Sequence, residues 1–241
     1  MSETANTLAV DPSKRWTIGA RRGLQIIVAV LLLYAGLDLF WPLHRDVRQF
    51  DPVAVGRLET QMWRSYYDRK PLALFLQLAE TLRTLYQFPL LRSYLGAYHA
   101  TFAAFRFKDG HQRSDYEEAL PALQRYFDTI RNTTSLDFDT QQAAALELEW
   151  WIVHRESINY PRDALGQACA EVAAYIYRLP LDSTLEHGRL RAAAMVLRDV
   201  RGDAGEVTDA DWMQIEALLR QSYQSLHRAV VNATSNSTAR S

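Results

Sequence analysis

The clearest feature of the hydropathy pattern is an unbroken apolar run over residues 24–41, LQIIVAVLLLYAGLDLFW. A helix of that length rises about 27 Å, close to the thickness of the hydrocarbon core of a bilayer. The one charge in the run, Asp38, lies near its end, and Pro42 follows as a helix stop. We therefore predict a transmembrane helix over residues 23–42.

The flanks of the run also fit a membrane anchor. Arg21 and Arg22 precede it and can extend their guanidinium groups to lipid headgroups. Trp16 and Trp41 bracket it, as two interfacial aromatic belts require. The residues assigned to the anchor are Arg21, Arg22, Leu24, Leu31, Leu32, Leu33 and Trp41.

Two other interpretations of the run stay open. A cleaved signal peptide also has a basic start and an apolar middle. Its best cleavage site, Leu33-Tyr34-Ala35, has Leu where a small residue is needed. A buried core helix is the second alternative, although few soluble helices are apolar on every face.

The charges around the run indicate an orientation. Four basic residues precede it and three follow within the next stretch, so the positive-inside rule places the N-terminal tail, residues 1–22, in the cytoplasm. The rest of the chain would then lie outside the cytoplasm, and we expect a bacterial inner membrane.

After a connector at residues 43–50, apolar residues recur with helical periodicity as far as residue 231. The first face holds Val55, Leu58, Met62 and Tyr66, at i, i+3, i+7 and i+11. Eight helices can be drawn, and their starts are marked by prolines or capping residues. These starts are Asp51-Pro52, Pro71, Pro89, Ser114, Asp137 or Asp139, Pro161, Ser183 and Thr208. Residues 232–241 form a polar tail, which we expect to be flexible.

The fold predicted for residues 51–231 is all-α. No β-branched run alternates strictly, and the short connections favour antiparallel helix pairs. The second helices of successive pairs begin near residues 71, 115, 161 and 209, at intervals of 44, 46 and 48 residues. This spacing suits either a helical-hairpin array or a closed bundle.

One segment resembles a known repeat. Asp115-Tyr116-Glu117-Glu118-Ala119-Leu120 is similar to the start of the second helix of a tetratricopeptide repeat. The resemblance covers one hairpin and implies a stack of helix pairs. The 34-residue period of that family is missing.

Charge and cysteine content exclude several functions. The formal net charge of the whole chain is -1, so no basic field favours nucleic acid. The single cysteine, Cys169, cannot form an internal disulfide, and we interpret it as a core residue. Neither Glu-x-x-His nor any nucleotide, hydrolase or metalloprotease motif occurs. We expect no cofactor and no metal.

The best chemical constellation lies on the predicted helix that ends near Glu156. Glu147, Trp151 and His154 share one face, at i, i+4 and i+7, beside Trp150. A buried Glu near a His can act as a general acid or base, but such groups more often satisfy one another between helices. Tyr98 and His99, on the helix that starts at Pro89, could face them. The candidate catalytic residues are His99, Glu147 and His154, and the candidate ligand contacts are Tyr98, Trp150 and Trp151.

Two further groups are assigned structural roles. Trp63, Tyr66 and Tyr67 are interpreted as core or membrane-proximal packing. Glu186-His187 is interpreted as a capping feature with a solvated His187.

The leading hypothesis is a membrane-anchored, non-catalytic module that binds another membrane or extracytoplasmic protein. It depends on the stacked helix pairs, which present extended surfaces. The alternative is an enzyme or small-ligand binder that uses the Glu/His/Trp pocket, and a third possibility is a structural subunit of a larger complex. The oligomeric state is left open.

Overall fold

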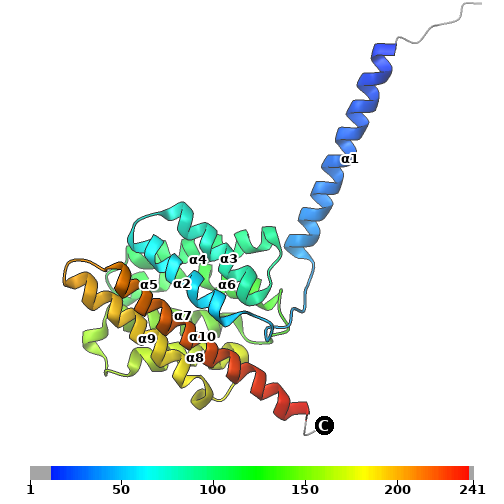
Figure 1. Cartoon of the computed structure of the whole chain (residues 1–241). Helices are drawn as coiled ribbons and strands as arrows, with labels where there is room; N and C mark the ends of the chain where they lie inside the picture. Colours follow the sequence, from blue (N-terminus) through cyan, green and yellow to red (C-terminus); the bar gives the residue numbers. More distant parts are fainter. Residues whose placement is uncertain (1–11, 239–241) are drawn as a thin grey trace, which may run out of the picture. The chain divides into compact units, whose positions relative to one another are not determined.

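The computed structural model describes the backbone of residues 12–238 and the side chains of residues 20–233. The chain is all-α: the described residues form helices and no strand, apart from an isolated bridge between Arg45 and Thr134. It divides after Trp41 into two compact units (Figure 1). Each unit is described separately below.

The first unit holds α1 (Pro12–Phe40). Its stretch Ala20–Phe40 is long and apolar enough to cross a membrane. The anchor residues named above are exposed all around this helix, with Leu24 at 62% and Leu32 at 69% of full exposure. An apolar surface left uncovered on every side of a helix is typical of contact with lipid.

The second unit is a ring of helices. Consecutive ring helices pack antiparallel on one another, and the last, α10, packs on the first, α2, so the ring closes. The ring helices are α2 (Pro52–Tyr67), α3 (Pro71–Tyr86), α4 (Leu90–Lys108), α6 (Leu120–Arg131), α7 (Thr140–Arg155), α8 (Ala164–Tyr177), α9 (Leu181–Asp203) and α10 (Asp209–Thr238). Short α5 (Arg113–Tyr116) and two 3₁₀ turns, Glu117–Ala119 and Ser157–Asn159, lie in the connections.

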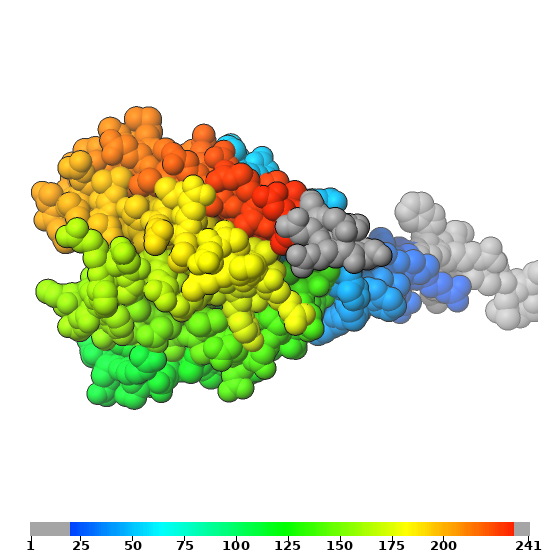
Figure 2. All heavy atoms as spheres, turned by 90° about the horizontal axis from the view of Figure 1, so that it is seen from below, coloured from blue at the N-terminus to red at the C-terminus, as the bar shows by residue number. Residues whose placement is uncertain are grey.

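Ring closure decides between the two arrangements that the sequence left open. A stack of hairpins would leave α2 and α10 at opposite ends, whereas here they share an extensive contact. In Figure 2 the yellow-to-orange spheres of α9 lie beside the orange-to-red spheres of α10, the helix that also packs on α2. The segment that resembles a tetratricopeptide helix is α5 and a 3₁₀ turn, and the long helix starts only at Leu120. The ring therefore shares antiparallel helix pairing with that repeat, but neither its 34-residue period nor its stacked arrangement.

Several helix starts follow the predicted capping chemistry. The Asp51 side chain accepts hydrogen bonds from the amides of Val53 and Ala54, and Asp139 accepts one from Gln142. Thr208 and Asp211 form a reciprocal capping box, with Asp211 N to Thr208 Oγ1 at 3.2 Å and Thr208 N to Asp211 Oδ2 at 3.0 Å. These side chains satisfy amides that the first turn of a helix leaves free.

Three expectations about helix ends were wrong. Ser114 and Ser183 do not cap: α5 has no side-chain cap, and α9 begins at Leu181, ahead of Ser183. The polar stretch after Val231 stays helical as far as Thr238, because α10 continues its hydrogen bonding past the ring.

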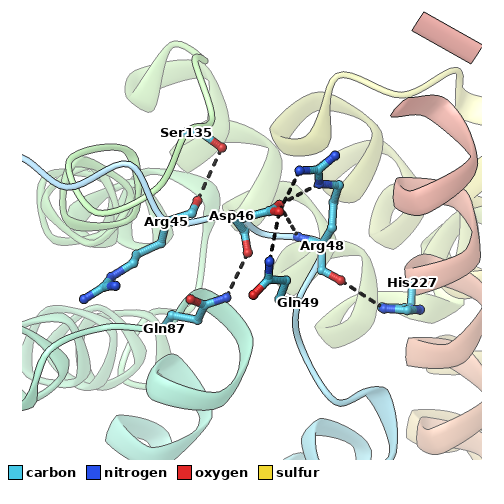
Figure 3. Close-up of polar contacts among 7 residues, drawn as sticks. All are labelled: Arg45, Asp46, Arg48, Gln49, Gln87, Ser135 and His227. Carbon is cyan, nitrogen blue, oxygen red and sulfur yellow. Dashed lines mark hydrogen bonds and ion pairs between the residues drawn. The ribbon is translucent and has the colours of Figure 1, made fainter. Parts of the chain in front are cut away.

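The connector, residues 42–50, is bound tightly to one end of the ring (Figure 3). Arg45 donates its amide to Thr133 O and accepts from the Ser135 amide. Gln87, at the end of α3, donates to Asp46 O at 2.9 Å, and His227 of α10 lies 3.0 Å from Arg48 O.

Two apolar connector side chains, Val47 and Phe50, join the main core. Phe50 also packs edge-on against the His227 ring. The connector therefore closes this end of the barrel, which we call the connector end.

Candidate functional site

The ring encloses a cavity of about 760 Å³. All eight ring helices contribute side chains to its wall. The lining residues that reach solvent all lie at or just beyond the C-terminal ends of α2, α4, α7 and α9, which point the same way: Tyr66, Phe105, Lys108, Arg155, Ser157 and Asp203. The cavity is thus open at the end opposite the connector, which we call the open end.

A buried ion pair crosses the interior from α2 to α9. Arg191 donates to Glu59 Oε1 from Nε at 3.0 Å and from Nη2 at 2.8 Å. Both donors use the same oxygen, whereas a side-by-side Arg–carboxylate pair would use both. Glu59 Oε2 is buried and makes no hydrogen bond, although the Tyr223 hydroxyl lies close to this carboxylate. The Glu59 side chain is only 2% exposed.

Arg191 and Glu147 meet the cavity rather than bulk solvent. The Arg191 side chain keeps 18% of its accessible surface although protein surrounds it, and both residues line the cavity. The guanidinium group also lies over the Trp150 ring, 4.7 Å from its centroid. A cation over an indole face is held by the ring quadrupole.

Glu147 projects from α7 into the same space. It accepts a hydrogen bond from Trp151 Nε1 at 3.1 Å. Burial raises the pKa of Glu147, and this outweighs the opposing effects of Arg191 and the two indoles. Trp150 Nε1 also faces Glu147, but the contact falls short of hydrogen-bond geometry and leaves this donor unpaired. We call Glu59, Glu147 and Arg191 the inner charged cluster.

Tyrosines surround this cluster. Tyr86, Tyr126, Tyr177 and Tyr223 come from four different helices, and burial raises the pKa of each phenol, so all four stay neutral. The Tyr177 hydroxyl forms no well-aligned hydrogen bond. The interior therefore offers neutral donors and acceptors as well as charges.

The open end is held by two sets of contacts. His154 Nε2 lies 2.7 Å from Asp199 Oδ2, and Arg198 pairs with the other oxygen of Asp199 at 3.0 Å while stacking on Tyr67. Arg155 donates to the carbonyls of Phe107, Lys108 and Gly110 and so ties α7 to the end of α4. A guanidinium at the C-terminal end of a helix is favourable for the helix dipole.

The structure brings together some of the predicted site residues. Glu147, Trp150, Trp151 and His154 all line the cavity. His154 lies at the open end, and its hydrogen-bond partner is Asp199 rather than Glu147.

Tyr98 and His99 lie outside the cavity. Tyr98 is 55% exposed and stacks on Phe102, and the charged groups near His99 are Arg125 and Asp128 of α6. The expected convergence of His99 with Glu147 and His154 does not occur, because α6 lies between α4 and α7 in the ring.

One structural assignment was wrong. His187 is buried, not solvated, and its Nδ1 lies 2.7 Å from the Ser222 hydroxyl. Burial lowers the pKa of His187 to about 4. Trp63 and Tyr67 pack against the core as expected, and with Tyr66 they also line the cavity toward the open end. Cys169 is buried as expected, but it also lines the cavity.

The main residues that sequence reasoning missed are Glu59 and Arg191. One signal was available: Glu59 follows Val55 by four residues, so it places a carboxylate on an otherwise apolar helix face. Its partner lies 132 residues away, and no local spacing could connect the two.

The fold and site together define a closed α-helical barrel with a polar, aromatic-lined internal cavity. The chain was compared with protein-family models, curated proteins and solved structures, and none of these comparisons gave a match.

Proposed function

We propose that this chain is a membrane-tethered receptor for a small molecule, which binds inside the helical barrel. The observation that carries the proposal is the enclosed cavity, plugged at the connector end and open at the other. Its volume lies within the roughly 300–1,000 Å³ typical of small-ligand sites.

The polar groups of the wall support this proposal. In the described part of the chain, five lining residues hold a buried polar atom without a hydrogen-bond partner: Glu59 Oε2, Thr101 Oγ1, Trp150 Nε1, the Tyr177 hydroxyl and Arg198 Nε. A buried polar atom without a partner costs free energy, and native proteins hold few of them. A ligand that reaches one of these atoms would recover that free energy on binding.

The tether is the second part of the proposal. We infer that Ala20–Phe40 spans a bilayer as an uncleaved signal-anchor. The four-to-three bias of basic residues supports a cytoplasmic N-terminus and an extracytoplasmic barrel, as in a bacterial inner-membrane protein.

Binding of a protein partner stays a prediction. It was based on the extended surface that stacked helix pairs present, and a closed ring contains no such stack. A protein partner would have to use the convex outside of the barrel.

Filling the cavity tests the receptor proposal. Ala104 lines the cavity, so Ala104→Trp should remove binding of any molecule that a ligand screen identifies by its thermal stabilisation of the full chain. The matched control is Ala145→Trp on the exposed side of α7, which should bind as the wild type does. Ligands that bind both variants equally would refute a site inside the barrel.

A further inference from the structure

The inner charged cluster holds two carboxylates, Glu59 and Glu147, but only one guanidinium group, that of Arg191. When both carboxylates are ionised the cluster has one negative charge in excess. Burial opposes this state by raising the pKa of Glu147, and a bound cation would favour it. Arg191 compensates one of the two carboxylates, Glu59 and Glu147. The other titratable groups nearby supply no cation: His187 is neutral because burial holds its pKa at about 4, and burial raises the pKa of Cys169 to about 12. A desolvated carboxylate without a counter-charge is unfavourable.

The second oxygen of Glu59 is buried in the wall. Arg191 holds Oε1 alone, and Oε2 lies in the wall of the cavity near the Tyr223 hydroxyl. Glu59 would therefore act on a molecule in the cavity through its charge rather than by direct contact of Oε2.

Aromatic rings make up much of the remaining wall. Twelve of them line the cavity, from Trp63 and Tyr66 near the open end to Tyr86 and Tyr223 beside the charged cluster. Ring faces attract cations and repel anions. Three lining rings already hold a guanidinium group: Arg155 lies over Phe107, Arg191 over Trp150 and Arg198 over Tyr67.

We propose that the ligand is a small organic cation, an amine or a quaternary ammonium compound, held by Glu59 and Glu147 among the surrounding indole and phenol rings. This inference rests on the proposed receptor function and names its ligand class. A neutral polyol would satisfy the hydrogen bonds but would leave the excess carboxylate unbalanced. An anion would add to the imbalance.

Three probes of nearly equal shape and different charge test the ligand class. They are choline, its neutral carbon isostere 3,3-dimethyl-1-butanol, and the anion 3,3-dimethylbutyrate. The full chain is placed in nanodiscs of phosphatidylglycerol, which carry no ammonium headgroup, with empty nanodiscs as the blank. Binding is measured by titration calorimetry and by the indole ¹⁵N–¹H NMR signals of Trp150 and Trp151.

We expect choline to bind at least about tenfold more tightly than the neutral isostere, and the anion not to bind. Glu147→Gln, which keeps an oxygen for Trp151 Nε1, should weaken choline binding about tenfold and leave the neutral probe unchanged. The control is Glu149→Gln on the same helix. It removes an equal charge from a surface pair with Arg113 and should bind choline as the wild type does.

The possible failures are distinct. Two results with the wild-type chain would overturn the cation assignment. The first is binding of the neutral or anionic probe that is as tight as that of choline or tighter. The second is the lack of saturable choline binding. If other molecules still bind and Ala104→Trp abolishes their binding, the receptor proposal survives and only the ligand class is wrong. If every ligand binds to Ala104→Trp as it does to the wild type, the receptor proposal itself is wrong.

Discussion

Gly56 on α2 lies so close to Arg220 on α10 that a Cβ added at Gly56 would come within 2.7 Å of the Arg220 Cα and backbone N. This is the seam where the last ring helix meets the first. The two backbones can approach only because position 56 has no side chain.

The first prediction concerns this seam. Gly56→Ala should lower the free energy of unfolding by about 1–3 kcal/mol, because backbone atoms, unlike a flexible side-chain end, must shift to make room. Denaturant unfolding measures the change. Gly202→Ala is the control: there the new Cβ meets only the side-chain end of Arg198, and the gain in helix propensity should make the variant neutral or slightly more stable.

The second prediction concerns the buried ion pair. Glu59→Gln removes the carboxylate that Arg191 hydrogen-bonds and leaves Glu147 as the one nearby counter-charge in the described part of the chain, so it should cost about 1–3 kcal/mol of stability. The double variant Glu59→Gln with Arg191→Met should recover only part of that loss, because Glu147 then has no cation beside it. A thermodynamic cycle built from these variants measures the coupling. Asp137→Ala, at a wholly exposed pair with Arg178, should change stability by less than about 0.5 kcal/mol. Additive effects of Glu59 and Arg191 would contradict the pairing.

The third prediction concerns pH. The pKa of His187 falls from 6.5 to about 4 on folding, so the unfolded chain binds more protons between these values. The contribution of His187 is therefore fully present above pH 6.5 and is lost as the pH falls toward 4, by about 3 kcal/mol at most. Glu147 acts in the opposite sense, because its raised pKa makes the folded state less stable as the pH rises above 4.5.

The effect of His187 can be isolated by comparison with His187→Asn, which keeps Glu147. The free energy of unfolding of both proteins is measured at pH 7 and at pH 4.5. Between these two pH values, it should fall further for the wild type than for the variant. Parallel pH profiles would show that the histidine is not buried in its neutral form.

The fourth prediction concerns the connector. Deletion of residues 1–41 should leave a soluble, folded helical barrel, since the second unit begins at Pro42. Deletion of residues 1–50 should destabilise it strongly, because Val47 and Phe50 leave the core and the polar groups that bind Arg45 and Asp46 lose their partners. Circular dichroism with thermal unfolding distinguishes the two. Equal stability of both products would mean that the connector only covers the barrel surface.

The fifth prediction concerns orientation. A reporter that is active only outside the cytoplasm should be active when fused after Ser241, if the bias of basic residues sets the topology. Reversing the bias, with Arg21→Glu and Arg22→Glu, should reduce that activity. An active cytoplasmic reporter at Ser241 in the unaltered chain would instead place the barrel inside the cell.

Local features of the fold were predictable from the sequence, and non-local ones were not. Asp51, Asp139 and the pair Thr208 and Asp211 mark helix starts correctly, because a cap acts within three residues of itself. Amphipathic spacing also identified Val55 and Leu58 as inward-facing, and both are buried. The same spacing could not show that α10 returns to α2, since a buried face does not reveal which partner covers it.

In the candidate site, too, the residues set by local spacing were predictable and those set by distant contacts were not. Glu147, Trp150 and Trp151 were found because they are neighbours on one helix. Glu59 and Arg191 were missed, and His99 was wrongly included, because their positions depend on the order of helices around the ring.

The return of α10 to α2 also governs how this protein is made. During synthesis the helices from α2 to α9 can pair one after another as they emerge, but the surface of α2 that holds Gly56 has no partner until α10 has emerged. Contacts between segments so distant in sequence form late and slowly. A nascent chain that stalls before α10 would expose both the open seam and the interior cluster to water and to chaperones. The cavity is enclosed only when α10 has emerged and packed on α2.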